Sequence, residues 1–322
     1  MKDVKIVAIG GGTGLSILLR GLKLFSEDIT AIVNVVDDGG GSGVLREDLA
    51  MLPPGDIRNC ILGLASKEPV LQELFAYRFD EGRYKNQSFG NLMIAAMLGI
   101  SDNFEDAISK ISHIFAVQGE VLPATNEDVH LVAELEDGTI VRGESKIPYQ
   151  VLKKHCPIKK VFLKPLEVNA LPRSIKAIGE ADIIFVGPGS LYTSLIPNLL
   201  VKGISEAISA STAQKIYLSN LMTQPGETDN FSISDHVKAI YDHSEIRFDY
   251  IVANNQEVSK EVKDRYQKED SIMLMLNKKD RKYFQEQNMK VVESDFIEVK
   301  QGYVRHDVTK IVDLLNNYIG KN

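Results

Sequence analysis

The stretch Val7-Ala8-Ile9-Gly10-Gly11-Gly12-Thr13-Gly14-Leu15-Ser16 decides how this chain is expected to fold. A short apolar run ends there in a glycine loop, and an amphipathic pattern with leucines on one helical face follows. Glycine has no Cβ, so the backbone can turn sharply and approach a ligand, and the first turn of a helix points free N–H groups at an anion. The stretch therefore predicts a strand–loop–helix unit that holds a phosphate group.

A second glycine-rich loop, Asp37-Asp38-Gly39-Gly40-Gly41-Ser42-Gly43, follows the next apolar run. The first loop departs from the G-x-G-x-x-G pattern of dinucleotide-binding proteins. Counted from Gly10 the pattern requires glycine where the chain has Leu15, and counted from Gly12 it requires glycine where the chain has Ile17. No Gly-Lys-Ser/Thr follows, so a Walker A loop is also excluded. The loops favour a phosphate-bearing ligand and disfavour an NAD-dependent oxidoreductase.

The composition is that of an ordinary soluble globular protein. Of the 322 residues, 44% are hydrophobic and 25% are charged. The formal net charge of −7 and the lack of a basic block disfavour nucleic acid as a partner. The two cysteines, Cys60 and Cys156, are too far apart in the sequence to suggest a zinc-ligand pair or a disulfide framework. The first apolar run is too short for a signal peptide or a membrane span, so we expect a cytoplasmic protein without membrane insertion.

Apolar runs alternate with helical patterns along most of the chain. The expected strands are 4–9, 29–36, 183–186, 215–219 and 250–253. The expected helices are 15–24, 44–51, 56–66, 68–78, 90–99, 104–112, 191–210, 233–243 and 307–318. Continuous apolar strands separated by helices indicate a parallel sheet covered on both faces. We therefore predict an α/β fold with a doubly wound, Rossmann-like, mostly parallel sheet.

The hydrophobic period changes between residues 113 and 165, where apolar and polar residues alternate and Glu136-Asp137-Gly138 is a hairpin signal. We interpret 113–165 as an antiparallel β insertion within a single domain that spans 1–322. The more charged portion 256–322 is expected to complete the fold. An exposed apolar stripe on its last helix would suit a homo-oligomer contact.

Polar loops fall where the predicted parallel strands end, which is where doubly wound sheets bind ligands. Asp37 and Asp38 follow the second strand, where a carboxylate can bind a ribose hydroxyl pair or, with its neighbour, Mg²⁺; the alternative is a solvated turn. Gly187-Pro188-Gly189-Ser190 repeats the anion-site pattern before a helix. The uncharged polar run from Asn220 to Thr228 suits a base, a sugar or a second phosphate.

For three weaker candidate binding residues, a purely structural role is at least as well supported as a role in ligand binding. Arg58 could pair with a phosphate, although an arginine in the first turn of a helix is more often solvated. Asn91 could be a helix cap, and Asn126 could form an Asx-turn. The six histidines show no metal-ligand spacing, and no nucleophile elbow or Cys–His arrangement is present. The sequence thus predicts a nucleotide-like binding site without an evident nucleophile or general base.

Seven motifs in sequence order resemble the YvcK (gluconeogenesis factor) branch of the CofD-like family. They are Ile9-Gly-Gly-Gly-Thr-Gly-Leu-Ser, Val36-Asp-Asp-Gly-Gly-Gly-Ser-Gly, Pro53-Pro-Gly-Asp-Ile-Arg-Asn, Phe89-Gly-Asn-Leu, Ala124-Thr-Asn, Val186-Gly-Pro-Gly-Ser-Leu-Tyr-Thr-Ser and Ser219-Asn-Leu-Met-Thr-Gln-Pro-Gly-Glu-Thr. One departure is Gly41, where this branch is expected to have serine, and it removes a hydroxyl donor. Residues beyond about 256 carry no motif that can be transferred.

The resemblance implies a bacterial cytoplasmic protein that binds UDP-sugars, notably UDP-N-acetylglucosamine. Since the sequence shows no evident general base, we expect this binding to occur without turnover. It also implies a requirement for cell shape and for growth on gluconeogenic carbon sources, with cell-wall synthesis proteins as partners. No cofactor is required for such binding. The CofD branch implies an alternative, a Mg²⁺-dependent transfer of a phospholactyl group from an activated nucleotide to a deazaflavin, with Asp37 and Asp38 as metal ligands.

The nucleotide or UDP-sugar is expected to contact residues of all these loops. They are Gly10, Gly11, Gly12, Thr13, Gly14, Asp37, Asp38, Gly39, Gly40, Ser42, Arg58, Asn59, Asn91, Asn126, Gly187, Pro188, Gly189, Ser190, Asn220, Thr223, Gly226 and Thr228.

Overall fold

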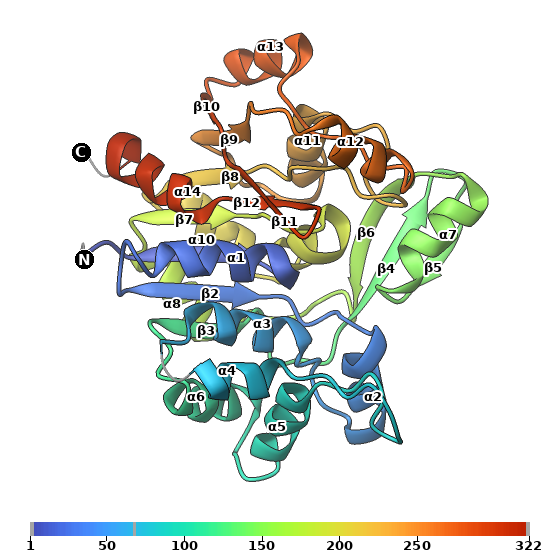
Figure 1. Ribbon diagram of the computed structural model, residues 1–322, viewed down its shortest axis with the longest axis vertical. Helices are drawn as coiled ribbons and strands as arrows, with labels where there is room; N and C mark the ends of the chain where they lie inside the picture. Colours follow the sequence, from blue (N-terminus) through green and yellow to red (C-terminus); the bar gives the residue numbers. More distant parts are fainter. Residues whose placement is uncertain (1–2, 67–68, 320–322) are drawn as a thin grey trace.

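The computed structural model describes residues 3–66 and 69–319, and a seven-stranded sheet forms its centre (Figure 1). The strands pair in parallel in the order β10-β9-β8-β7-β1-β2-β3. Their bounds are β1 (Ile6–Gly10), β2 (Ile29–Val33), β3 (Glu120–Pro123), β7 (Ile183–Val186), β8 (Gln214–Leu218), β9 (Tyr250–Asn254) and β10 (Lys290–Ser294). This confirms the predicted doubly wound, Rossmann-like α/β class.

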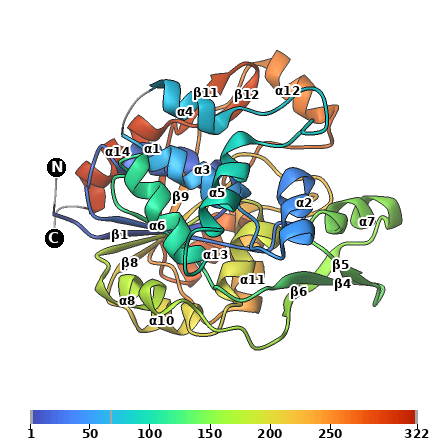
Figure 2. The same ribbon diagram turned by 90° about the horizontal axis from the view of Figure 1, so that it is seen from below.

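Helices cover both faces of this sheet, as Figure 2 shows for α1, α3 and α14 on one face and α8, α10 and α11 on the other. As a result β1, β2, β7 and β9 are buried at every position, which explains their uninterrupted apolar sequences. The helices on the first part of the chain are α1 (Gly12–Leu22), α2 (Gly40–Leu49), α3 (Gly55–Leu64), α4 (Pro69–Ala76), α5 (Phe89–Leu98) and α6 (Phe104–Ile114). Those that follow are α7 (Lys146–Lys154), α8 (Pro172–Glu180), the π-helical turn η1 (Leu191–Leu195), α9 (Ile196–Leu199), α10 (Ile204–Ala210), α11 (Ile233–His243), α12 (Lys260–Gln267), α13 (Lys278–Glu286), α14 (Val308–Leu314) and the π-helical turn η2 (Leu315–Ile319).

A separate antiparallel sheet stands beside the carboxyl ends of the central strands (Figure 1). It consists of β5 (Ile140–Arg142), β4 (His130–Leu135) and β6 (Ile158–Lys164), with α7 between β5 and β6. The expected extent of this insertion, 113–165, was wrong at its start because β3 pairs in parallel with β2 and belongs to the central sheet. The misleading alternation comes from the end of α6 and a turn, which together precede β3.

The C-terminal portion adds β10 to the edge of the central sheet and the antiparallel hairpin β11 (Ile297–Lys300) and β12 (Tyr303–His306). Its last helix is not an exposed dimer contact, contrary to expectation. Helix α14 packs against α1 so closely that a Cβ at Gly21 would lie 2.7 Å from the Cβ of Val308. The apolar stripe, including Ile311 and Leu314, is buried in the core for this reason.

Among the helices of residues 3–66 and 69–319, none is both long enough and apolar enough to cross a bilayer.

Candidate functional site

The order of the central strands creates a crevice between β1 and β7. The chain proceeds from β1 to β2 and β3 on one side, and from β7 to β8, β9 and β10 on the other. In open α/β sheets ligands bind outside the carboxyl ends of the strands at such a reversal point. Gly11 caps α1 at this point, and Gly12 has a φ of +65°, a conformation that favours glycine.

Two glycine loops border the crevice and touch each other: Gly10–Gly14 after β1, and Gly187–Ser190 after β7. A Cβ at Gly14 would lie 2.9 Å from the carbonyl oxygen of Pro188, so only a residue without a side chain allows this approach. The Asn220 side chain holds the loop after β7 by bonding to both backbone groups of Gly189. Its Oδ1 accepts a hydrogen bond from Gly189 N–H at 3.3 Å, and its Nδ2 donates to the Gly189 carbonyl at 2.8 Å. Asn220 thus positions the loop.

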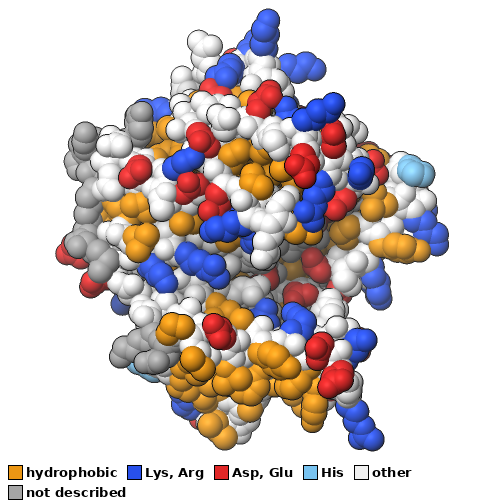
Figure 3. Space-filling model, in the orientation of Figure 1, with side chains coloured by type: hydrophobic (Ala, Val, Ile, Leu, Met, Phe, Trp, Pro, Cys, Tyr) orange, Lys and Arg blue, Asp and Glu red, His pale blue; other side chains and the backbone are white. Residues whose placement is uncertain are grey.

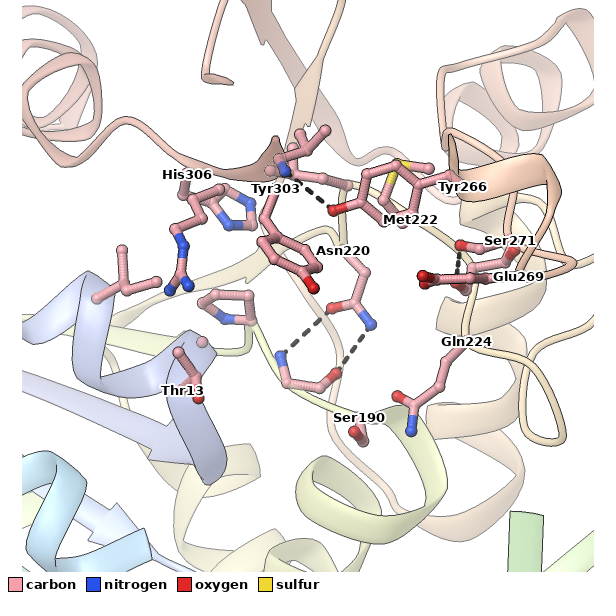
Figure 4. A pocket seen from close by; sticks show the side chains of 18 of the residues that line it. Thr13, Ser190, Asn220, Met222, Gln224, Tyr266, Glu269, Ser271, Tyr303 and His306 are labelled. Atoms are coloured by element: carbon pink, nitrogen blue, oxygen red, sulfur yellow. Dashed lines mark hydrogen bonds between the residues drawn. The ribbon is translucent and has the colours of Figure 1, made fainter. Parts of the chain in front are cut away.

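A cavity of about 440 Å³ opens above these loops (Figure 4). Its floor includes Thr13 and Gly14 from α1 and Gly189 and Ser190 from the loop after β7. Its far wall comes from α12, the segment that follows it, and β12, which are remote in sequence from the glycine loops. The other lining residues include Asn220, Met222, Thr223, Gln224, Tyr266, Glu269, Ser271, Tyr303, Arg305 and His306.

The wall formed by α12 and β12 combines aromatic rings with one uncompensated cation. The Tyr266 hydroxyl accepts a hydrogen bond from the backbone N–H of Val304 at 2.9 Å, which joins α12 to the hairpin. His306 donates from Nε2 to the Ser219 carbonyl at 3.0 Å, and burial lowers its pKa to about 4, so this imidazole is neutral. Within the described part of the chain, Arg305 has no ion pair or side-chain hydrogen bond. Its guanidinium is therefore available to an anionic ligand.

A cluster of carboxylates lies beside the α1 loop. Asp56 at the start of α3 accepts hydrogen bonds from Gly12 N–H and from Asn34 Nδ2, the latter at 3.2 Å. Burial and the nearby charge of Asp37 nevertheless raise its pKa to about 6. A Cβ at Gly11 would lie 2.4 Å from the Asp56 carboxylate, so glycine is required to admit this side chain. Figure 3 shows acidic side chains within a hollow near the middle of this face.

Glu144, between β5 and α7, completes the carboxylate cluster. Burial raises its pKa to about 8, with further contributions from Asp37, Glu227, Asp38 and Asp56. Several acids that repel one another and carry strongly raised pKa values are typical of a functional site. The antiparallel insertion therefore contributes to the site through Glu144.

Asp37 and Asp38 form turn hydrogen bonds and also lie in the carboxylate cluster. Both expectations for them, a turn and a ligand or metal site, are therefore compatible with the structure. Asp37 accepts a hydrogen bond from Gly39 N–H at 2.9 Å at the start of α2, and Asp38 accepts from Ser145 N–H at 2.8 Å. No group of three or more His, Cys, Asp or Glu side chains among residues 3–66 and 69–319 is arranged to hold a metal ion. Carboxylate pairs with substrate phosphates are a usual Mg²⁺ environment, so the proposed metal role stays a prediction.

The loop after β8 is held mainly by its own hydrogen bonds. Thr223 lines the cavity, but its Oγ1 accepts from Ile272 N–H at 2.9 Å. Thr228 Oγ1 accepts from Gln224 N–H at 2.8 Å, and Gly226 packs under Pro148, whose carbonyl oxygen would lie 2.5 Å from a Cβ. Gly226 and Thr228 do not line the cavity. They shape the loop that carries the buried Glu227.

Glu227 joins this loop to η1. Its carboxylate accepts hydrogen bonds from Tyr192 N–H at 3.1 Å and Thr193 Oγ1 at 3.0 Å. Burial raises its pKa to about 7.

The remaining predicted residues form a layer next to the carboxylates or lie apart from them. Arg58 is buried and donates to Asn59 Oδ1 at 2.9 Å. Asn91 is buried and its Nδ2 is 3.5 Å from Ser42 Oγ. Asn126 is exposed after β3 and does not line the cavity.

Sequence reasoning missed the wall made by Tyr266, Tyr303, Arg305 and His306, as well as Glu144. These residues belong to no glycine loop, and only the tertiary fold brings them to the carboxyl end of the sheet. The alternation of Tyr303 and Arg305 on one strand is the single local signal that they face the same side.

The fold and the crevice define a Rossmann-like α/β protein with a ligand cavity at the strand-order reversal. The chain belongs to the CofD family, because the family model described as 2-phospho-L-lactate transferase CofD matches residues 6–297. A relative from Clostridium acetobutylicum is 53% identical over 316 residues, which are 98% of this chain and 69% of that protein. The gluconeogenesis factor of Bacillus subtilis is 45% identical over 97% of this chain and 96% of its own length.

A solved structure shares the complete fold. The crystal structure of a Bacillus halodurans protein, 44% identical in sequence, superposes with a TM-score of 0.92 and covers 97% of this chain and 99% of the other. These similarities confirm the resemblance to the gluconeogenesis factor branch that the sequence motifs indicated.

Proposed function

We propose that this protein binds a UDP-sugar, with UDP-N-acetylglucosamine as the leading candidate, and acts as a regulator without turning it over. The observation that carries the proposal is the cavity in which the α1 loop, the Gly189–Ser190 loop and Arg305 converge. Its volume of about 440 Å³ suits a small ligand. The loops offer backbone N–H groups to a diphosphate, and Arg305 supplies a positive charge.

The two tyrosines of the cavity support a ligand with a flat or ring-shaped part. The Arg265 guanidinium covers one face of the Tyr303 ring at 4.0 Å from its centroid, which leaves the other face, and Tyr266, for a base or a sugar to pack on. The proposed roles in cell shape and in growth on gluconeogenic carbon sources, and the proposed cell-wall synthesis partners, rest on the family resemblance. A cytoplasmic location goes with these roles.

Calorimetric titration with UDP-N-acetylglucosamine, with and without Mg²⁺, tests the proposal. We expect micromolar affinity that is indifferent to Mg²⁺, weaker binding of GTP, and intact nucleotide recovered by chromatography. Arg305→Gln should weaken binding at least tenfold, about 1.4 kcal/mol. The exposed Arg83→Gln, outside the cavity, is the matched control and should bind normally. No binding at millimolar nucleotide, or equal losses in both variants, would refute the proposal.

A Mg²⁺-dependent phosphotransferase is the second candidate, and the carboxylate cluster is the observation that favours it. Asp37 and Asp38 supply the hard oxygen donors that Mg²⁺ prefers, and their charges act on the Glu144 carboxylate beside them. Bound there, Mg²⁺ would neutralise charge on a transferring phosphoryl group. For this function, nucleotide binding should tighten with Mg²⁺ and Asp37→Asn should abolish that gain. If Mg²⁺ has no effect on affinity, the second candidate loses its support.

A further inference from the structure

A second cavity lies between the antiparallel insertion and α2, and we call it the insertion cavity. Its volume is about 550 Å³, which suits a small molecule. Strands β4, β5 and β6 and the start of α7 form one wall, and α2 forms the other. Figure 1 shows α2 and the insertion next to each other in the right-hand part of the molecule. Among the residues that the structure describes, none lines both this cavity and the one above the glycine loops.

The strand register places positive side chains on one face of the insertion. Lys164 of β6 is directly opposite His130 of β4, and Arg142 of β5 is directly opposite Val132 of β4. Residues paired in this way, and residues two apart on one strand, point to the same face of a sheet. All four of these residues line the insertion cavity. The opposite face, which includes Leu131, is buried in the core.

Three cations of the insertion cavity are not neutralised by other side chains. In the part of the chain that the structure describes, Arg142, Lys146 and Lys164 form no ion pair and no side-chain hydrogen bond. The Lys164 ammonium lies over the ring of Phe162, 5.6 Å from its centroid, on the same face of the sheet. All three cationic side chains are exposed, so their charged groups are accessible to a ligand.

Two of the three acids that line the insertion cavity are already bonded. Asp128 pairs with Arg46 Nη2 at 2.5 Å, and Asp38 accepts a hydrogen bond from Ser145 N–H at 2.8 Å. The third acid is the exposed Glu47 of α2. The lining has four arginines or lysines against these three acids, so its formal charge is +1, whereas the whole chain carries −7. This cavity is therefore locally positive in an acidic protein.

A glycine brings the start of α7 to the insertion cavity. Gly143, between β5 and α7, has a φ of +100°, and a Cβ there would lie 2.5 Å from Asp38 Oδ2. Because glycine has no side chain, this turn can close against Asp38, and Lys146 at the start of α7 then lines the cavity. Glu144 in the same turn belongs to the carboxylate cluster. The insertion cavity therefore borders that cluster.

We propose that the insertion cavity binds a small phosphorylated metabolite, as a second ligand site separate from the cavity above the glycine loops. Phosphate oxygens accept strong, charge-assisted hydrogen bonds from ammonium and guanidinium groups, and the planar fork of Arg142 can bind two of them at once. Val132 and the aliphatic stems of Lys146 and Lys164 offer apolar surface to the carbon skeleton of such a ligand.

Protection of single lysines from an amine-reactive reagent tests this proposal. The full-length protein is acetylated briefly with and without millimolar pyrophosphate, at equal ionic strength, and each site is quantified by peptide mass spectrometry. We expect pyrophosphate to slow the modification of Lys146 and Lys164 at least about threefold. Lys153 is the matched control, because it is an exposed lysine on the same helix outside the cavity, and its rate should not change.

A substitution checks that the cations act together. Arg142→Gln should remove most of the protection of Lys146, whereas Lys153→Gln should leave it intact. Arg142 is exposed, so the variant should fold, and thermal melts would verify this. The proposal is overturned by equal rates with and without pyrophosphate, by equal protection of Lys153, or by full protection in Arg142→Gln. Neither Lys146 nor Lys164 lines the cavity above the glycine loops, so this outcome is separate from that of the proposed function.

Discussion

Replacing Glu144 by Gln should stabilise this protein at alkaline pH. Burial and the neighbouring carboxylates raise the pKa of Glu144 from an ordinary 4.5 to about 8. The folded protein thus holds this proton more tightly than the unfolded chain does. The free energy of unfolding therefore falls as the pH rises from 4.5 to about 8, and stays level above that. Glutamine has nearly the same shape but carries no charge at any pH, so it avoids this loss.

The size of the effect follows from the difference between the two pKa values. At about 1.4 kcal/mol for each tenfold change in proton affinity, the rise from 4.5 to about 8 is worth about 5 kcal/mol. Glu144 is partly exposed, and it titrates together with Asp37, Asp38, Asp56 and Glu227, so much of this is screened or shared. We expect about 1.5 kcal/mol, which corresponds to about 3 °C in melting temperature.

Thermal melts of both proteins between about pH 5 and pH 9, in buffer with a chelator, measure this difference. The two melting temperatures should nearly coincide at about pH 5 and separate progressively toward pH 8, with the variant higher. Glu136→Gln, an exposed carboxylate near the same insertion, is the control and should show no such divergence. A Glu144→Gln protein that melts with or below the wild type near pH 8.5 would show that the carboxylates do not repel as we infer.

Three further predictions concern the loops and the thiols. Gly14→Ala should weaken nucleotide binding at least tenfold in calorimetry, since its Cβ would lie 2.9 Å from the Pro188 carbonyl oxygen; Gly179→Ala, with open space around it, should bind normally. Asn220→Asp removes the donor to the Gly189 carbonyl and should lower the free energy of unfolding, measured with denaturant, by about 1–3 kcal/mol. An unchanged midpoint would show that the loop keeps its conformation without this hydrogen bond. A thiol reagent should modify Cys156 quickly but Cys60 only after unfolding, because Cys60 is fully buried and burial raises its thiol pKa; rapid loss of both thiols in the native protein would contradict the packing of α3.

The central sheet could be predicted because its strands are short, apolar and separated by helices, a pattern that few folds produce. The start of the insertion could not, because the end of α6, a turn and β3 together imitate one alternating strand. The expected helix 191–210 is interrupted for a similar reason. Its apolar positions continue through Leu200 and Val201, but Gly203 has a φ of +99° and caps a new helix, α10. Local periodicity does not record such breaks.

The candidate site was predictable where it depends on glycine loops at strand ends. Gly14 and Ser190 line one cavity because both glycine loops follow parallel strands, as expected, and because β1 and β7 are neighbours, which the structure shows. Asn126, by contrast, follows β3 at the sheet edge and remains exposed. The wall with Tyr303 and Arg305 could not be predicted, because its place depends on how the C-terminal hairpin folds back over the sheet. No local sequence signal specifies that return.

The cavity above the glycine loops is built from segments that lie far apart in the sequence, so a ribosome synthesises them at different times. Thr13 is synthesised long before Tyr303 and His306, and also long before the helix that packs on α1. A growing chain thus has the anion loops long before it has the wall that closes them. Any ligand of this cavity therefore stabilises finished molecules and leaves unfinished ones to proteolysis. Its concentration would then influence how much protein accumulates, apart from what the bound form does.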